Sequence, residues 1–130
     1  MSNRLFNILF APITIVTLTA TMKLCCINIQ CGLKEKIDVI ECILAEKKID
    51  DVVSLIETDL GPHDVPPTIP GFECVPDHSR RMCLYICDNF TYKLIEYSGS
   101  LPAIAISTKQ FVVGFIYSQF MKDAYTSLRL

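Results

Sequence analysis

The sequence predicts an α/β protein whose sheet system mixes parallel and antiparallel strands. A short apolar run at residues 23–29 is followed by a helical pattern at residues 34–48 and by a second apolar run at residues 51–58. A strand, a helix and a strand in this order form a βαβ unit with parallel neighbours. Several short apolar runs with brief turns follow after residue 70, a pattern typical of antiparallel strands.

The composition is that of one folded domain that carries no dominant charge. Hydrophobic residues make up 51% and charged residues 20% of the 130 residues, which excludes a disordered chain. The formal net charge is −2, whereas a nucleic-acid binder usually carries a basic face. The arginine doublet, Arg80 and Arg81, is a candidate contact to a nucleic-acid backbone, with a solvated loop as the structural alternative.

The first two elements follow from apolar periodicity. Residues 23–29 are apolar, contain β-branched residues and are followed by Gly32, so they are predicted to form a buried strand. Residues 34–48 are predicted to form a helix, with Lys47 and Lys48 in the last turn, where positive charge suits the helix dipole. The apolar side chains at helical spacing are Ile37, Ile40, Ile43 and Leu44.

Two polar side chains lie at the predicted ends of the parallel strands. The apolar run at residues 51–58 includes Glu57 near its end, and Asn28 lies near the end of the first strand. The carboxyl ends of parallel strands are where open α/β sheets bind ligands. Asn28 and Glu57 therefore form a candidate Mg²⁺ site, because Mg²⁺ prefers oxygen ligands. The structural alternative is a turn residue and a solvated strand-end charge.

The rest of the chain is predicted to be loops and short strands. Prolines and glycines between residues 59 and 70 predict a loop. Two antiparallel pairs are expected to follow a short strand, the first turning at Asp88-Asn89 and the second at Ser107-Thr108-Lys109. The predicted strands are 71–75, 82–87 paired with 91–96, and 101–106 paired with 110–117.

The two ends of the chain are predicted to lie outside the domain. Residues 1–21 are apolar but broken by Asn7 and Pro12, so they are either an extension with no folding role or a signal or membrane anchor. Residues 121–130 form a C-terminal tail, helical or frayed, and the domain occupies residues 22–120. An intracellular protein is favoured, with secretion or membrane anchoring as the alternative.

Neither the cysteines nor the histidines indicate a zinc site. The seven cysteines are odd in number and show no CxxC spacing, so reduced and buried thiols that act as small hydrophobic residues are expected. His63 and His78 are the two histidines, and both fall in predicted loops. Tyr117 ends an apolar strand and is a candidate phosphate contact, with a half-buried aromatic side chain as the alternative.

The order of these segments resembles the endonuclease/exonuclease/phosphatase superfamily. The likeness is greatest to the endonuclease domains of non-LTR (LINE-type) retrotransposons, and it covers about residues 22–120. Residues 26–33 resemble the opening strand of the family, residues 49–60 its second strand, and residues 113–117 a later strand that ends in Tyr. Between them, residues 69–72 and 82–87 match a proline-glycine-aromatic strand start and the following core strand.

The resemblance implies a fold, a cofactor and a set of site residues. It implies part of a four-layer α/β sandwich, an Mg²⁺ site at Asn28 and Glu57, a scissile phosphate facing Tyr117, and DNA as partner. This chain departs from the family in an extra residue, Cys31, before the glycine. The Asp-x-Asn and Asp-His pairs of the family lie downstream of the part that this chain matches. The implied function is therefore a truncated Mg²⁺-dependent endonuclease or phosphodiesterase without complete catalytic machinery.

Two alternatives remain beside this prediction. A half sandwich exposes an apolar sheet face, which favours self-association or a partner chain that covers it. The chain could then be a non-catalytic binding or interaction protein, secreted or anchored through residues 1–21. The remaining alternative is a remnant of a mobile element with no selected function.

Overall fold

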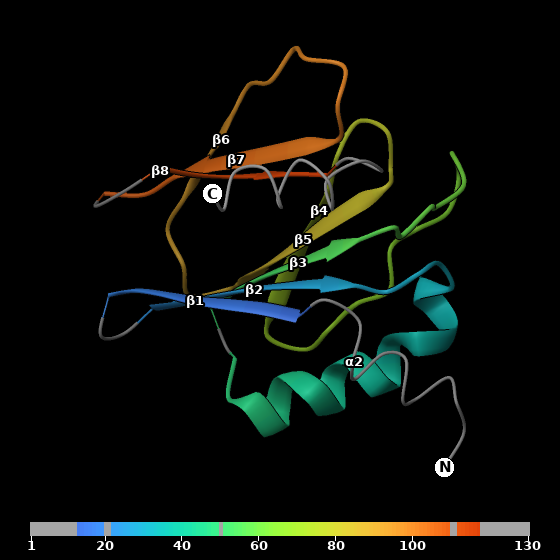
Figure 1. The fold of residues 1–130 in the computed structure, drawn as a ribbon, viewed down its shortest axis with the longest axis horizontal. Coiled ribbons are helices and arrows are strands. Elements are labelled where there is room, and N and C mark those ends of the chain that lie inside the picture. The colour runs from blue at the N-terminus through green and yellow to red at the C-terminus, as the bar shows by residue number, and fades with distance from the viewer. Residues whose placement is uncertain (1–12, 20–21, 50, 110–111, 118–130) are drawn as a thin grey trace, which may run out of the picture.

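A computed structural model describes residues 13–19, 22–49, 51–109 and 112–117. Figure 1 shows a helix, a larger sheet and a smaller sheet stacked in layers. The elements in chain order are β1 (Ile13–Thr19), β2 (Met22–Asn28), α2 (Leu33–Lys47), β3 (Val52–Ile56), β4 (Phe72–Pro76), β5 (Met82–Cys87), β6 (Lys93–Ile95), β7 (Ala103–Ser107) and β8 (Val112–Ile116).

The five-stranded sheet is built around the predicted βαβ unit. Its strand order is β1-β2-β3-β5-β4. Strands β2 and β3 are parallel and in register from Leu24 opposite Val52 to Asn28 opposite Ile56, while the other neighbours are antiparallel. The mixed α/β class is therefore confirmed, and so is the parallel pairing on either side of α2.

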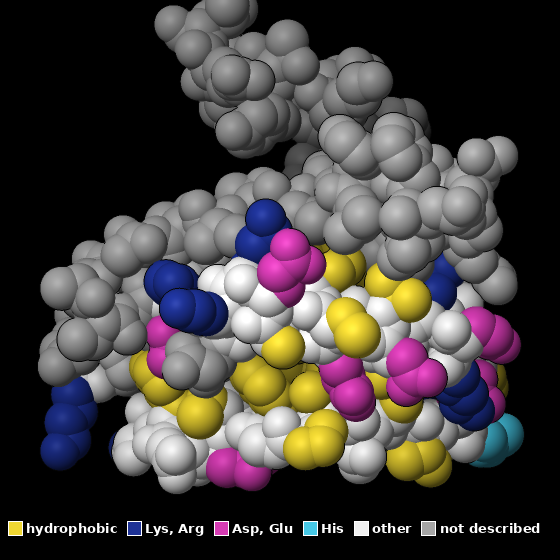
Figure 2. All heavy atoms as spheres, turned by 90° about the horizontal axis from the view of Figure 1, so that it is seen from below, with side chains coloured by type: hydrophobic (Ala, Val, Ile, Leu, Met, Phe, Trp, Pro, Cys, Tyr) yellow, Lys and Arg dark blue, Asp and Glu magenta, His cyan; other side chains and the backbone are white. Residues whose placement is uncertain are grey.

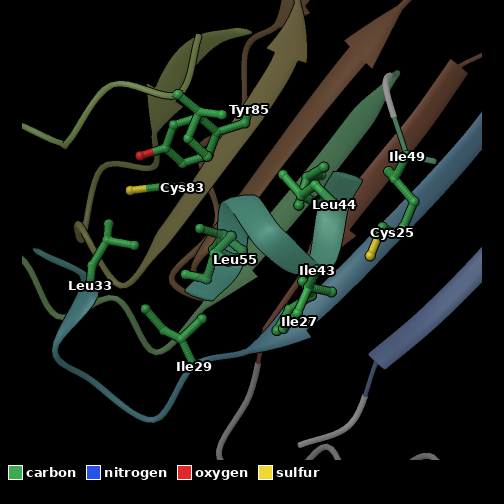
Figure 3. Packing of buried hydrophobic residues seen from close by; sticks show 13 residues of the cluster. Cys25, Ile27, Ile29, Leu33, Ile43, Leu44, Ile49, Leu55, Cys83 and Tyr85 are labelled. Carbon is green, nitrogen blue, oxygen red and sulfur yellow. The ribbon is translucent and has the colours of Figure 1, made fainter. Parts of the chain in front are cut away.

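Helix α2 covers one face of this sheet. It begins after Gly32, whose φ of 74° is a left-handed conformation that glycine adopts without a steric penalty. It ends at Lys48, where the N–H donates back to the carbonyls of the last turn. The helix buries one stripe against apolar side chains of β2, β3 and β5, as Figure 3 shows. This cluster includes Leu33, Ile40, Ile43, Leu44, Ile27, Leu55 and Tyr85.

A three-stranded sheet covers the opposite face. Its order is β6-β7-β8, and both pairings are antiparallel, which confirms the predicted pairing of the last two strands. A second apolar cluster lies between the two sheets and includes Leu24, Val52, Met82, Leu84, Ile86, Ile104, Ile106, Phe115 and Tyr117. The described residues thus form one helical layer and two sheets, and they contain no helical layer outside the smaller sheet, as a four-layer sandwich would require.

Two features of the topology differ from the predictions. The hairpin predicted between residues 82–87 and 91–96 is wrong, because β5 pairs with β3 and β4, whereas β6 pairs with β7. The chain after β5 crosses from one sheet to the other, and Phe90 and Tyr92 pack against the cluster between the sheets. Because this connecting segment contains apolar side chains, its sequence has the pattern of a strand paired with β5.

Strand β1 is the second difference. No strand was predicted within residues 1–21, yet Ile13–Thr19 pairs antiparallel with β2, with Ile13 opposite Ile27. The segment is rich in the β-branched residues that favour strands. It extends the sheet by one edge strand. The predicted C-terminal tail at residues 121–130 lies outside the described residues.

The outer face of the smaller sheet carries exposed apolar side chains. Ile95, Val112 and Ile116 are 39%, 67% and 53% exposed. The register places them on the face that points away from the larger sheet. Large apolar side chains gathered on one face are common at interaction surfaces.

Replacing Leu55 with Ala is expected to lower the free energy of unfolding by about 2–5 kcal/mol, because the deletion leaves a cavity under α2. Val112→Ala is the control, since that side chain is 67% exposed and its loss should cost less than about 0.5 kcal/mol. Urea unfolding measures both values. Similar losses in the two variants would contradict the placement of the core.

Candidate functional site

The candidate site lies at the carboxyl ends of β2 and β3. Asn28 is the last residue of β2, and it pairs in register with Ile56, the last residue of β3. Glu57 follows directly. Two backbone hydrogen bonds continue this pairing beyond the strands, from Ile29 N to Ile56 O (3.1 Å) and from Cys31 N to Glu57 O (2.9 Å). The predicted proximity of Asn28 and Glu57 thus follows from the parallel register.

Asn28 shapes the turn that leaves β2. Its Oδ1 accepts a hydrogen bond from the backbone N–H of Gln30 at 3.0 Å. Asparagine commonly forms such a bond to the backbone two residues further on, in an Asx turn. The side-chain oxygen that a metal would bind is therefore engaged with the backbone, which fits the structural alternative for Asn28 and lets it fix the shape of the site.

The loop between β2 and α2 is held in an uncommon conformation. Gln30 and Cys31 have φ of 54° and 66°, in the left-handed region, ahead of Gly32 at 74°. The buried Lys36 on α2 donates from Nζ to the carbonyls of Ile29 and Gln30. These charge-assisted bonds tie the loop to the helix and compensate its backbone strain.

Tyr117 reaches Glu57 from the other sheet. It follows β8 directly, its N–H donates to the Pro102 carbonyl at 2.9 Å, and its side chain is only 6% exposed. Burial raises the pKa of Tyr117, and the negative charge of the nearby Glu57 carboxylate raises it further. The phenol is therefore a stable proton donor at neutral pH, and the two predicted site residues lie close enough to interact electrostatically.

Arg81, which directly precedes β5, lies beside Tyr117. Its guanidinium carbon lies 5.2 Å from the centroid of the Tyr117 ring, and its Nε lies 3.4 Å from Oδ1 of Asp59. Its side chain is 33% exposed, so the cation faces solvent on one side. The positive charge of Arg81 opposes the effect of Glu57 on the pKa of Tyr117. The candidate site is hereafter the group Asn28, Glu57, Asp59, Arg81 and Tyr117.

Arg80 has a different position from Arg81. Its Nε donates to the Gly61 carbonyl at 2.9 Å, and its terminal nitrogen donates to the Asp64 carbonyl. Its own carbonyl accepts from Leu60 N and from the Thr58 hydroxyl, both at 3.0 Å. Arg80 therefore holds the loop after β3 in place, which fits a structural role more closely than the predicted nucleic-acid contact.

The turn that carries Arg81 is organised by a buried carboxylate. Asp77 is 4% exposed and accepts hydrogen bonds from the backbone N–H groups of Ser79, Arg81 and Met82, at 2.9–3.0 Å. It also accepts from the Ser79 hydroxyl at 2.6 Å. Buried polar groups need such partners, and here the partners fix the backbone of Arg81. The sequence shows nothing of this role beyond a polar residue in a turn.

The sequence analysis missed Asp59, which belongs to the site, and the role of Cys31 beside it. Asp59 contacts both Arg81 and the Cys31 thiol, which donates to its Oδ2 at 2.9 Å. Asp59 lies two positions after Glu57, and only its spacing could have indicated that it shares the same edge. Cys31 was noted only as an extra residue, and in the structure it links the two strand-end loops. The bond to Asp59 raises the pKa of the Cys31 thiol.

Neither histidine belongs to this group. His78 lies 3.8 Å from the Asp77 carboxylate and has its ring 6.3 Å from that of Tyr97, while His63 is exposed in the loop after β3. Within the described ranges, no group of three or more His, Cys, Asp or Glu residues has the arrangement of a metal site. All seven cysteines are free.

Charge is mixed on the side of the molecule that carries α2. Figure 2 shows acidic and basic side chains interspersed with apolar ones on this face. An extended nucleic acid needs a continuous basic surface, and the described residues of this face offer no such track. In the part of the chain that the structure describes, no helix has the length and apolar character needed to span a membrane.

Comparison with known proteins gives no relative. No family model, no curated protein and no solved structure matches this chain.

Glu57→Gln is expected to lower the pKa of Tyr117, because a neutral amide no longer opposes the phenolate. Arg81→Gln should raise it, because the phenolate loses a neighbouring cation. The ¹³Cζ chemical shift of labelled tyrosine, followed against pH, measures both shifts. Tyr117→Phe assigns the signal. Shifts in the same direction in both variants would contradict the arrangement.

Proposed function

We propose that this chain is an Mg²⁺-dependent endonuclease-like domain of retrotransposon type that binds a phosphodiester and carries part of the catalytic machinery. The observation that supports this most is the electrostatic interaction of Tyr117 with Glu57. These residues come from different sheets, and the family resemblance assigns one to the phosphate and the other to the metal. Asn28, the third residue that the resemblance assigns, lies at the same sheet edge.

The side chains present fit Mg²⁺ in part. Glu57 and Asp59 supply carboxylate oxygens at one sheet edge, and Mg²⁺ is usually held by one or two carboxylates together with water and substrate phosphate. Asp59, however, is paired with Arg81 and accepts from Cys31. We therefore assign the principal contact to Glu57 and give Asn28 the role of shaping the loop beside it. A bound Mg²⁺ would supply positive charge for the phosphate oxygens.

The phosphate side of the site would be formed by Arg81 and Tyr117. A guanidinium can donate two parallel hydrogen bonds to phosphate oxygens, and Arg81 is already oriented by Asp59 and by the Tyr117 ring. The raised pKa of Tyr117 keeps its hydroxyl protonated, so it can donate to a phosphate oxygen. Both groups would bind and orient the substrate without changing their protonation.

Backbone strain at the site supports a functional role. Outside glycine, the described residues with φ between 45° and 66° are Gln30, Cys31, Lys48, Glu57, Asp59 and Arg80. Apart from Lys48 at the end of α2, they lie in the loops around the candidate site. Such conformations cost on the order of 1–3 kcal/mol each and cluster at functional sites.

Hydrolysis would also need a base to activate water. In the family that the chain resembles, a histidine oriented by an aspartate serves this role. His78 is engaged with Asp77 and Tyr97, away from the group defined above as the site. The proposal is therefore binding of metal and phosphodiester, with little or no turnover by this chain alone.

A second candidate is a non-catalytic interaction protein. The exposed Ile95, Val112 and Ile116 on the outer face of the smaller sheet favour it. A partner chain or a second copy would cover them, and DNA would not. In that case the polar cluster at Glu57 would serve only to hold the loops together.

Titration calorimetry with Mg²⁺ tests the proposed site. The wild-type chain should bind Mg²⁺, and Glu57→Gln should weaken binding by at least about tenfold, because it removes the principal carboxylate. Glu46→Gln is the matched control, since Glu46 is exposed on α2, and it should bind like the wild type. Equal affinities for the wild type and Glu57→Gln would remove the metal assignment.

Nicking of supercoiled plasmid in the presence of Mg²⁺ separates binding from turnover. We expect little or no nicking by the wild-type chain. Nicking that disappears in Glu57→Gln but persists in Glu46→Gln would show that the chain, alone or self-associated, has a complete active site, and would contradict the proposed lack of turnover.

A further inference from the structure

A second group of reactive side chains lies on the β4–β5 hairpin, away from the candidate site. Cys74 on β4 pairs directly with Tyr85 on β5. Because side chains alternate along a strand, Cys83 and Cys87 lie on the same face of the hairpin as Tyr85, one on each side of it. Cys74 therefore has two cysteines as diagonal neighbours, and Cys83 packs with Tyr85 in the core beneath α2.

The two diagonal neighbours are not equivalent. Cys83 belongs to the apolar cluster beneath α2 and Cys74 packs against that cluster, whereas Cys87 is not part of it. The interaction between the thiols of Cys74 and Cys83 lowers the pKa of Cys74 and raises that of Cys83. Cys83 is fully buried, whereas Cys74 is partly exposed. Cys74 is therefore the thiol that a soluble oxidant reaches first, and it has the greater thiolate character.

We propose that Cys74 and Cys83 form a redox pair, which closes to an intramolecular disulfide across the β4–β5 hairpin when the chain meets a hydroperoxide. The inference does not depend on the proposed nuclease-like function. It rests on the diagonal placement of the two thiols, on their packing in one cluster beneath α2 and on their unequal exposure.

The chemistry needs only the two thiols and the hydroperoxide. The Cys74 thiolate attacks the distal peroxide oxygen, the O–O bond breaks, and an alcohol or water leaves with the proton that Cys74 gave up. Cys74 is then a sulfenic acid. The Cys83 sulfur attacks the Cys74 sulfur, the S–O bond breaks, and the hydroxyl leaves as water with the Cys83 proton. Two thiols are oxidised to one disulfide, and the peroxide bond is reduced.

The hairpin can supply the geometry that a disulfide requires. Diagonal neighbours in an antiparallel pair have Cα atoms about 7–8 Å apart, whereas disulfides need less than about 7 Å. Strand β4 is at the edge of the sheet and is hydrogen bonded only to β5, so it can move toward Cys83 without breaking a second ladder. Both side chains already pack into the cluster beneath α2, so they lie on the same face of the hairpin.

Formation of the disulfide would fix β4 at the edge of the larger sheet. The disulfide would join β4, which precedes the turn that contains Asp77 and Arg81, to β5, which follows that turn. An edge strand is the part of a sheet most exposed to fraying and to pairing with other chains. Oxidation would thus hold β4 in place and restrict the turn that presents Arg81.

Peptide mapping after hydrogen peroxide treatment tests the pair. Trypsin cuts at Arg80 and Arg81, which separates Cys74 from the peptide that contains both Cys83 and Cys87. We expect an intramolecular cross-link between these peptides with the loss of two hydrogen atoms, in the monomer fraction. Tandem fragmentation between Cys83 and Cys87 assigns the linked sulfur without any substitution. A link to Cys87, or no link once the exposed Cys31 and Cys42 are oxidised, would overturn the proposal.

Matched variants give an independent readout. Cys87→Ser should leave the cross-link unchanged, and Cys83→Ser should abolish it. Circular dichroism melts establish that each variant is folded before oxidation. A cross-link that persists in Cys83→Ser and disappears in Cys87→Ser would place the redox pair on the other diagonal and overturn the assignment.

Discussion

The parallel pairing of β2 and β3 is the constraint on which the rest of the structure depends. Parallel neighbours require a crossover, and α2 supplies it while covering one face of the sheet. The core beneath α2 consists almost entirely of side chains that this arrangement brings together, such as Ile27, Ile40 and Leu55. The same register makes Asn28 and Ile56 neighbours, so the loops after both strands begin at one edge.

The smaller sheet completes the site by packing on the opposite face. Ile104, Ile106 and Phe115 bury this sheet against β2, β3 and β5, and this contact carries Tyr117 to Glu57. Apolar burial, which has no directional preference of its own, thereby determines which polar groups meet. The loops around the site are then held in defined positions, because Lys36, Arg80 and Asp77 each form several hydrogen bonds with a segment of loop backbone.

Local sequence patterns predicted the positions of the helix and the strands better than they predicted which strands pair. Ile37, Ile40, Ile43 and Leu44 recur at helical spacing, and α2 lies within a residue of its predicted limits at each end. The pairing of β5 was mispredicted because a turn sequence such as Asp88-Asn89 occurs both in hairpins and in connections between two sheets. Of the site, Asn28, Glu57 and Tyr117 follow from strand ends and from the resemblance. Asp59 and the difference between Arg80 and Arg81 depend on loop geometry, which periodicity does not encode.

Paramagnetic relaxation by Mn²⁺, which takes the same oxygen ligands as Mg²⁺, tests most directly whether one cation site joins the two sheets. We expect substoichiometric Mn²⁺ to broaden the amide signals of Cys31 and Thr58 and the ring signals of Tyr117 together, while the amide of Glu46 at the far end of α2 stays sharp. Equal broadening at Glu46, or broadening that leaves Tyr117 unaffected, would contradict a shared site at Glu57.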